Sequence, residues 1–133
     1  MVKTRDGFVS NSSTTSFIIR TKWSIEKSKE KLEKTISCYN EVFETNLKFD
    51  DVVKIYLASR GKVFDLIYEE EVGVNFNDED NEEVEKHTDL FIDSFPIYQG
   101  NFYLVIESVE ENSIPDELLF WIEKLFHAYE TKH

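Results

Sequence analysis

Glycine and proline are scarce in this chain, which contains only four glycines and two prolines among its 133 residues. Because these residues mark most turns and loops, their scarcity indicates mostly regular secondary structure. It also excludes a glycine-rich loop of the kind that cradles phosphates. No apolar run approaches the roughly 18 residues of a membrane-spanning helix. The N-terminus lacks the continuous apolar stretch of about 7–15 residues that a secretory signal has. We therefore expect no membrane contact and a cytoplasmic protein.

Cysteine and histidine are also rare, and they form no recognisable chemical site. Cys38 is the single cysteine, so the chain cannot form an internal disulfide. It stands beside apolar positions of an expected helix, where cysteine usually behaves as a small buried hydrophobic residue. Glu83 and His87 would share a helix face, but a metal site needs three or four converging ligands. The acids nearby do not fit a calcium loop, because Glu83 takes the place of the loop glycine. The sequence predicts no metal, no cofactor, no catalytic residues and hence no enzyme.

Aromatic residues, by contrast, are abundant, with eleven phenylalanines, six tyrosines and two tryptophans. This content argues against disorder, which is associated with few aromatics. The length fits one domain that is large enough to bury a core. Since no repeat and no linker divides the chain, we treat residues 1–133 as a single domain.

The most distinctive stretch is residues 5–17, which read Arg-Asp-Gly-Phe-Val-Ser-Asn-Ser-Ser-Thr-Thr-Ser-Phe. Six hydroxyl residues lie between Ser10 and Ser16. Apolar residues bracket them closely, with Phe8 and Val9 before the run and Phe17 directly after it. A polar linker has no need of such brackets, whereas a signal, a substrate peptide or a docking segment does.

This stretch resembles the opening of a loose group of prokaryotic, archaeal and phage-encoded proteins that begin with Arg-x-Gly-Phe-Val-Ser-Asn-Ser-Ser-Ser-Ser-Ser-Phe. Thr14 and Thr15 stand where the group usually has serine, and their β-branching favours extended backbone. The group has no established activity, so the resemblance implies a prokaryotic or viral source and no mechanism. The matching residues are Arg5, Gly7, Phe8, Val9, Ser10, Asn11, Ser12, Ser13, Ser16 and Phe17.

Charge is distributed unevenly along the chain, whose formal net charge is −12. Residues 1–64 carry a net charge of +4, residues 65–93 carry −11 and residues 94–133 carry −5. The middle segment thus accounts for nearly all of the imbalance. Such a field repels nucleic-acid phosphates and attracts basic protein surfaces.

The first half of the chain predicts one strand and two helices. Residues 16–23 are rich in β-branched and aromatic side chains and indicate a strand. Ser24 can cap the following helix, which should end near residues 45–46. A shorter second helix is expected from Asp50 to a left-handed stop at Gly61. The apolar face of the first helix consists of Ile25, Leu32, Ile36, Tyr39 and Phe43, and that of the second of Phe49, Val52, Val53, Tyr56 and Leu57.

The middle of the chain is less regular. Residues 63–68 indicate a second strand, which can continue through residue 74. Residues 77–85 are too charged to bury, so they form either a loop or the exposed first turns of a helix that Pro96 ends. Residues 102–109 alternate and predict a third strand, and the turn-like residues 98–101 can pair a short fourth strand with it.

A final helix completes the pattern. It starts at Ser113 or Ile114 with Pro115 in its first turn. Its apolar face consists of Leu118, Leu119, Ile122, Leu125, Phe126 and Tyr129. The order of elements predicts an α+β fold, with a three- to four-stranded antiparallel or mixed sheet packed against three to four helices.

The acidic segment, exposed over residues 77–89, is either a solubilising loop or a surface that docks a basic partner or imitates nucleic-acid phosphates. The second interpretation describes a small accessory protein that acts by protein–protein contact, such as a phage or mobile-element inhibitor of a basic host protein. We expect no direct nucleic-acid binding, because acids interleave with the lysines of the first helix. The expected contact residues are Glu69, Glu70, Glu71, Asp78, Glu79, Asp80, Glu82, Glu83 and Glu85.

The alternative function is that of a structural or cargo protein whose segment from Gly7 to Phe17 is docked, modified or cleaved by a partner. A plain tail that leads into the first strand is the simpler interpretation of the hydroxyl-rich residues 1–16. We expect residues 1–9 to be loosely held and residues 10–16 to form an ordered surface loop. Phe17 to Ile19 should lie in a central strand, because uninterrupted apolar residues suit a strand that is covered on both faces.

Overall fold

The computed structural model describes residues 14–72 and 78–132, with side chains described for residues 14–70 and 82–131. Helices and strands alternate along this part of the chain. The elements are β1 (Thr15–Ile18), α1 (Ile25–Phe43), α2 (Phe49–Val52), β2 (Val53–Ser59), α3 (Arg60–Val72), α4 (Asp78–Ile92), β3 (Phe102–Ser108), α5 (Asp116–Phe126) and β4 (Tyr129–Lys132).

The four strands form one antiparallel sheet in the order β2-β3-β1-β4. This order interleaves two β-α-β units. The strands of the unit β1-α1-β2 flank β3, and the strands of the unit β3-α5-β4 flank β1. The helices α3 and α4 form a hairpin inserted between β2 and β3. The predicted α+β fold class is therefore confirmed, with the sheet antiparallel throughout.

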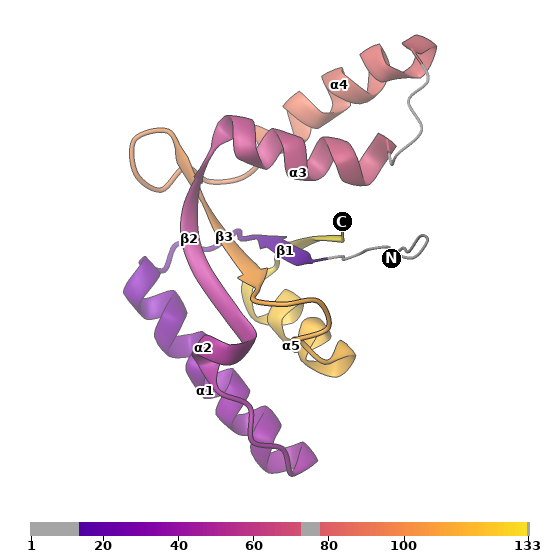
Figure 1. The fold of residues 1–133 in the computed structure, drawn as a ribbon. Helices are drawn as coiled ribbons and strands as arrows, with labels where there is room; N and C mark the ends of the chain where they lie inside the picture. The colour runs from indigo at the N-terminus through magenta and orange to yellow at the C-terminus, as the bar shows by residue number, and fades with distance from the viewer. Residues whose placement is uncertain (1–13, 73–77, 133) are drawn as a thin grey trace, which may run out of the picture.

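Helices cover the sheet on both faces (Figure 1). The helices α1 and α5 lie on one face and the α3–α4 hairpin lies on the other. Each interface contains its own core of buried side chains. The first core includes Phe17, Leu32, Ile36, Leu104, Ile106, Leu118, Ile122 and Phe126, and the second includes Ile18, Val63, Ile67, Ile92, Phe95 and Val105.

The central strand β1 confirms the expectation for Phe17 to Ile19. It pairs with β3 on one side and with β4 on the other. Phe17 and Ile19 belong to the first core and Ile18 to the second, so successive side chains fill opposite faces. The strand ends at Ile18, earlier than residue 23, although the Ile19 N–H still donates to the Leu104 carbonyl at 3.0 Å.

The prediction for α1 is also confirmed. The Ser24 side chain accepts a hydrogen bond from the Lys27 N–H, and Leu32, Ile36 and Tyr39 are buried. The helix ends slightly before the expected position, at Phe43, where Glu44 adopts a left-handed conformation with φ +55°.

The predicted conformations of residues 50–61 and 63–68 were wrong. Of the expected second helix, only the start is helical in α2 (Phe49–Val52), and the residues that follow form the strand β2 up to Ser59. Gly61 does not stop a helix but lies in the first turn of α3. The expected second strand is helical because its buried residues Val63, Leu66 and Ile67 have the spacing of a helix face.

In the C-terminal half, the fourth strand does not lie where the sequence predicted it. Residues 98–101 form a turn, with Gly100 at φ +56°, but Gln99 makes only an isolated bridge to Phe102. The fourth strand is β4, so Tyr129 belongs to a strand and not to the last helix. Residues 102–108 form β3 as predicted.

Both neighbouring helices are placed slightly differently from the prediction. The last helix begins at Asp116 with Pro115 as its N-cap residue, so neither Ser113 nor Ile114 caps it. Instead the Ser113 hydroxyl donates to the Val52 carbonyl at 3.0 Å. Residues 78–92 are helical, as one of the two interpretations of the acidic segment requires, and the helix ends before Pro96. No helix in the described part of the chain is long and apolar enough to cross a membrane.

Candidate functional site

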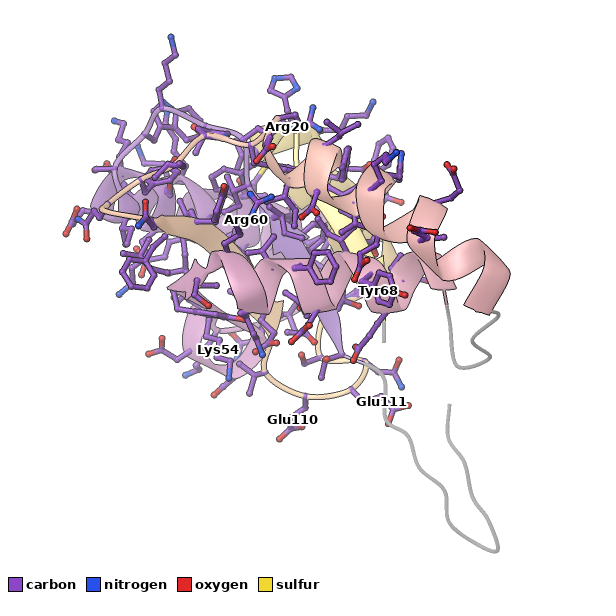
Figure 2. The ribbon with its side chains drawn as sticks, turned by 90° about the horizontal axis from the view of Figure 1, so that it is seen from above. Arg20, Lys54, Arg60, Tyr68, Glu110 and Glu111 are labelled. Carbon is purple, nitrogen blue, oxygen red and sulfur yellow. The ribbon has the colours of Figure 1, made fainter. Side chains whose placement is uncertain are left out.

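The α3–α4 hairpin is fixed to the sheet at its base. Val63 and Ile67 of α3 and Ile92 of α4 are buried in the second core. The guanidinium of Arg60, at the start of α3, donates to Asp93 Oδ1 at 2.7 Å and to Asp89 Oδ1 at 3.1 Å. Because Asp89 belongs to α4 and Asp93 follows directly after its last residue, this pair of contacts joins the two helices beside the sheet (Figure 2).

Acidic side chains gather on the other half of the hairpin. Glu69 and Glu70 are exposed near the end of α3, and Glu82, Glu83 and Glu85 are exposed on α4. Figure 1 shows the first turns of α4 extending away from the sheet. The chain thus brings together two acidic groups that the sequence separates. The side chains of Glu71, Asp78, Glu79 and Asp80 lie outside the described residues, although α4 begins at Asp78.

Four of these acids have no partner of opposite charge among the described residues. None of the ion pairs between described residues includes Glu69, Glu82, Glu83 or Glu85. On α4, Asp78, Glu79 and Asp80 are in the first turn, where the helix dipole favours negative charge, and Glu82, Glu83 and Glu85 follow them. Glu69 and Glu70 lie near the C-terminus of α3, where the dipole disfavours it. The acids of α3 therefore reduce the stability of the helix that carries them.

The structure describes only the end of the hydroxyl-rich motif, from residue 14 onward. Ser16 was expected both as the first residue of the strand 16–23 and as the last residue of the surface loop 10–16. It lies in β1 and is fully buried, so the strand prediction is confirmed at this residue. The loop prediction was wrong for Ser16 because it pairs with Glu107 of β3 and with Thr131 of β4, which bury it between two strands. The Thr15 N–H donates to Ser108 Oγ at 3.0 Å. Arg5 to Ser13 lie outside the described residues, so the docking and modification interpretation remains a prediction for them.

A hollow beside β2 was not predicted from the sequence. It has a volume of about 390 Å³ and is open to solvent. The residues that line it come from three elements: Lys54, Ile55 and Tyr56 from β2, Glu107 from β3 and Lys62 from α3. Figure 2, which looks onto the hairpin, shows Lys54 emerging beside α3. These residues meet only through the β2–β3 register, which places Lys54 opposite Glu107.

Polar groups converge in this hollow. Lys54 Nζ lies 3.3 Å from Glu107 Oε1, and the Ser16 hydroxyl lies 3.4 Å from Glu107 Oε2. The hydroxyl oxygen of Tyr56 is buried and makes no hydrogen bond of good geometry with a described residue. Burial, together with the negative charge of Glu107, raises the pKa of Tyr56 to about 12. The Tyr56 hydroxyl therefore keeps its proton near neutral pH and is available as a donor.

The remaining candidates form no chemical site. Cys38 is exposed and not buried, because its position on α1 turns away from both neighbouring helices and the sheet. His87 stacks on the Phe91 ring with the centroids 6.2 Å apart. His127 does not lie within the last helix but ends it, in a left-handed conformation with φ +52°. Among the described residues, no three His, Cys, Asp or Glu side chains converge as metal ligands would.

Comparison of the chain with protein-family models, with curated proteins and with solved structures finds no match in any of the three.

Proposed function

We propose that this is a small accessory protein that acts by protein–protein contact, through the acidic half of the α3–α4 hairpin. The partner is a protein with a basic surface. The observation that carries the proposal is the gathering of exposed glutamates from two helices on one hairpin, where Glu69, Glu82, Glu83 and Glu85 take part in no ion pair between described residues. The N-terminal resemblance favours a phage or mobile-element inhibitor of a basic host protein as the specific form.

The hairpin suits this role because its acids occupy helices and not a loose loop. Arg60 joins the helices at the base, and the second core holds them on the sheet. A surface that is already ordered loses little conformational entropy when it binds. The repulsion among the acids, and between Glu69 and the α3 dipole, is relieved when a cationic surface approaches. The electrostatic repulsion that destabilises the free protein is therefore removed in the complex, and its removal favours binding.

The experiment compares two variants that change the same amount of charge. The first replaces six acids at the hairpin by Asn or Gln: Asp78, Glu79, Asp80, Glu82, Glu83 and Glu85. The matched control replaces six exposed acids of the α1–α2 region in the same way: Glu26, Glu33, Glu41, Glu44, Asp50 and Asp51. Proteins captured from a lysate by the wild type are identified by mass spectrometry, and the principal one is purified for direct binding measurements.

We expect the hairpin variant to lose the partner and the control to retain it. Binding to the purified partner should weaken steeply with ionic strength, because exposed charges are screened within about 10 Å at 0.1 M salt. Undiminished binding by the hairpin variant would refute the proposal. Equal loss in both variants would also refute it, since the net charge and not the hairpin would then decide binding.

A further inference from the structure

The strand β2 forms one edge of the described sheet, since β3 is its single partner there. The Val109 N–H donates to the Val52 carbonyl at 2.9 Å, which fixes the alternation of hydrogen bonds along this ladder. Lys54 and Tyr56 consequently turn their backbone groups toward β3. Ile55 and Leu57 turn theirs outward, where no hydrogen bond from a described residue reaches them.

The hollow beside β2 extends over this edge. Successive side chains of a strand point to opposite faces of the sheet. A hollow on one face would therefore touch alternate residues of β2, but this one is lined by the consecutive residues Lys54, Ile55 and Tyr56. Ile55, Tyr56 and Leu57 are only half-buried along the same edge. The site thus combines outward backbone groups, apolar side chains and a polar recess.

Several polar groups around the recess have unused capacity as donors. The Lys62 ammonium takes part in no ion pair between described residues. The Tyr56 hydroxyl is buried and makes no hydrogen bond of good geometry with a described residue, although Glu107 lies close enough to raise its pKa. Lys54 has further N–H groups beyond its contact with Glu107. The Glu107 side chain is only 15% exposed and already receives Lys54 and Ser16. Donors of this kind suit a carboxylate, which accepts up to four hydrogen bonds.

From this arrangement we infer that the β2 edge binds an extended peptide that carries a carboxylate side chain. The peptide adds as a further strand beyond β2 and pairs with the backbone groups of Ile55 and Leu57. A Glu or Asp opposite Tyr56 lies on the same face as Lys54 and Lys62, because opposite residues of paired strands share a face. This surface differs from the acidic hairpin, so the inference does not depend on the proposed function.

A lysine on an edge strand often serves a different purpose, because its charge discourages pairing with another strand. Here the Lys54 ammonium contacts Glu107 on the inner strand β3, and so it is drawn over the sheet and not over the open edge. The position leaves the backbone of β2 accessible. The lysine is therefore better placed to receive an anionic side chain than to block a strand.

The probe is an acetylated and amidated peptide, Thr-Val-Thr-Glu-Thr-Val-Thr, used beside versions with Gln or Lys in the central position. Binding to the full chain is followed by amide chemical shifts and by amide exchange. We expect the Glu peptide to slow exchange at Ile55 and Leu57 by at least about fivefold. The Gln peptide should bind about tenfold more weakly, a difference of about 1.4 kcal/mol for one charge-assisted contact. The Lys peptide should not bind.

Variants of the recess test the role of the donors. The double substitution Lys54→Met and Lys62→Met should abolish the preference for Glu over Gln, whereas the control Lys22→Met and Lys48→Met should keep it. Tyr56→Phe removes one hydroxyl without changing shape, and we expect it to weaken the Glu peptide several-fold. The six-acid hairpin variant should respond as the wild type does, which separates this test from that of the proposed function.

Three outcomes would overturn the inference. In the first, no peptide alters exchange at Ile55 or Leu57. In the second, N-acetylglutamate amide binds as tightly as the peptide and leaves both amides unprotected, so that the recess is an anion pocket only. In the third, the two amides become protected without peptide as the protein concentration rises, which assigns the edge to a second copy of this chain.

Discussion

The two helical layers of this protein differ in how well they satisfy the local rules of helix stability. In α1, Ser24 caps the N-terminus, Glu26 lies in the first turn, and Glu30 contacts both Lys27 and Lys34. In the α3–α4 layer, acids lie at the C-terminal end of α3 as well as at the N-terminal end of α4. The Ser24 cap and Glu26 stabilise the N-terminal end of α1, and α5 in the same layer has acids in its first turn and Lys124 in its last turn, whereas the acids at the end of α3 oppose the helix dipole. Such local conflicts are expected where a surface serves another purpose than folding.

The largest effect should come from the strand that both layers share. Phe17→Ala removes a fully buried ring from the centre of the sheet, so we expect the free energy of unfolding to fall by about 3–5 kcal/mol. Urea denaturation measures this change. Leu90→Ala is the control, because Leu90 is 67% exposed on α4 and should change stability by less than about 0.5 kcal/mol. Similar losses in the two variants would show that the Phe17 ring is not a buried part of the first core.

The second prediction concerns Tyr56, which should make the stability of the protein depend on pH. Its pKa in the folded protein is about 12, against an ordinary value of 10.0. Between these values the folded protein binds more protons than the unfolded chain, so stability falls as the pH rises from about 10 to about 12. Because the side chain is partly exposed, screening limits the effect to about 1 kcal/mol.

The variant Tyr56→Phe should therefore lose less stability than the wild type across this pH range, with little difference below pH 9. Denaturant midpoints at a series of pH values provide the measurement. Parallel losses in the two proteins would mean that the Tyr56 hydroxyl is as accessible as that of an ordinary tyrosine.

The elements also differ in how well they could be predicted from the sequence, as α1 and β2 show. The helix α1 has a cap and a long periodic apolar face, and both signals are local. The strand β2 has neither, because Val52, Val53 and Tyr56 match a helical spacing while Val53, Ile55 and Leu57 match a strand. Its conformation is decided by pairing with β3, which lies far along the chain. Short apolar runs of this kind depend on tertiary contacts.

The candidate surfaces, too, could be predicted only where their residues are close in the sequence. The glutamates of the acidic surface could be predicted because they cluster in the sequence, and the structure adds that they occupy two packed helices. The hollow could not be predicted, since Lys54 and Glu107 meet only through the β2–β3 register. No local signal distinguishes Lys54 from the other exposed lysines of the first half of the chain.

Arg60 offers a smaller test, confined to the α3–α4 layer. Arg60→Gln removes the contacts to Asp89 in α4 and to Asp93 directly after it, while the hydrophobic base remains. As the Arg60 side chain is 40% exposed, we expect a global loss of only about 0.5–1 kcal/mol. Amide exchange in α4 should rise more than exchange in α1. Lys34→Gln is the control, because it removes an ion pair within α1. If exchange in α4 were unchanged in the Arg60→Gln variant, the hydrophobic base alone would hold the hairpin.

The smallest effects should come from neutralising one glutamate in each layer, and the two changes in stability should have opposite signs. Glu26 lies in the first turn of α1, where the helix dipole stabilises a negative charge, so Glu26→Gln should lower stability by about 0.3–1 kcal/mol. Glu69 lies near the end of α3, where the same charge is unfavourable, so Glu69→Gln should raise stability by a similar amount. Both changes should shrink as salt is added, because both residues are exposed. Thermal denaturation of the two variants at low and high ionic strength measures the signs. A loss of stability in Glu69→Gln would mean that Glu69 has a favourable partner within the free protein, and the cost attributed to the acidic surface would then be lower.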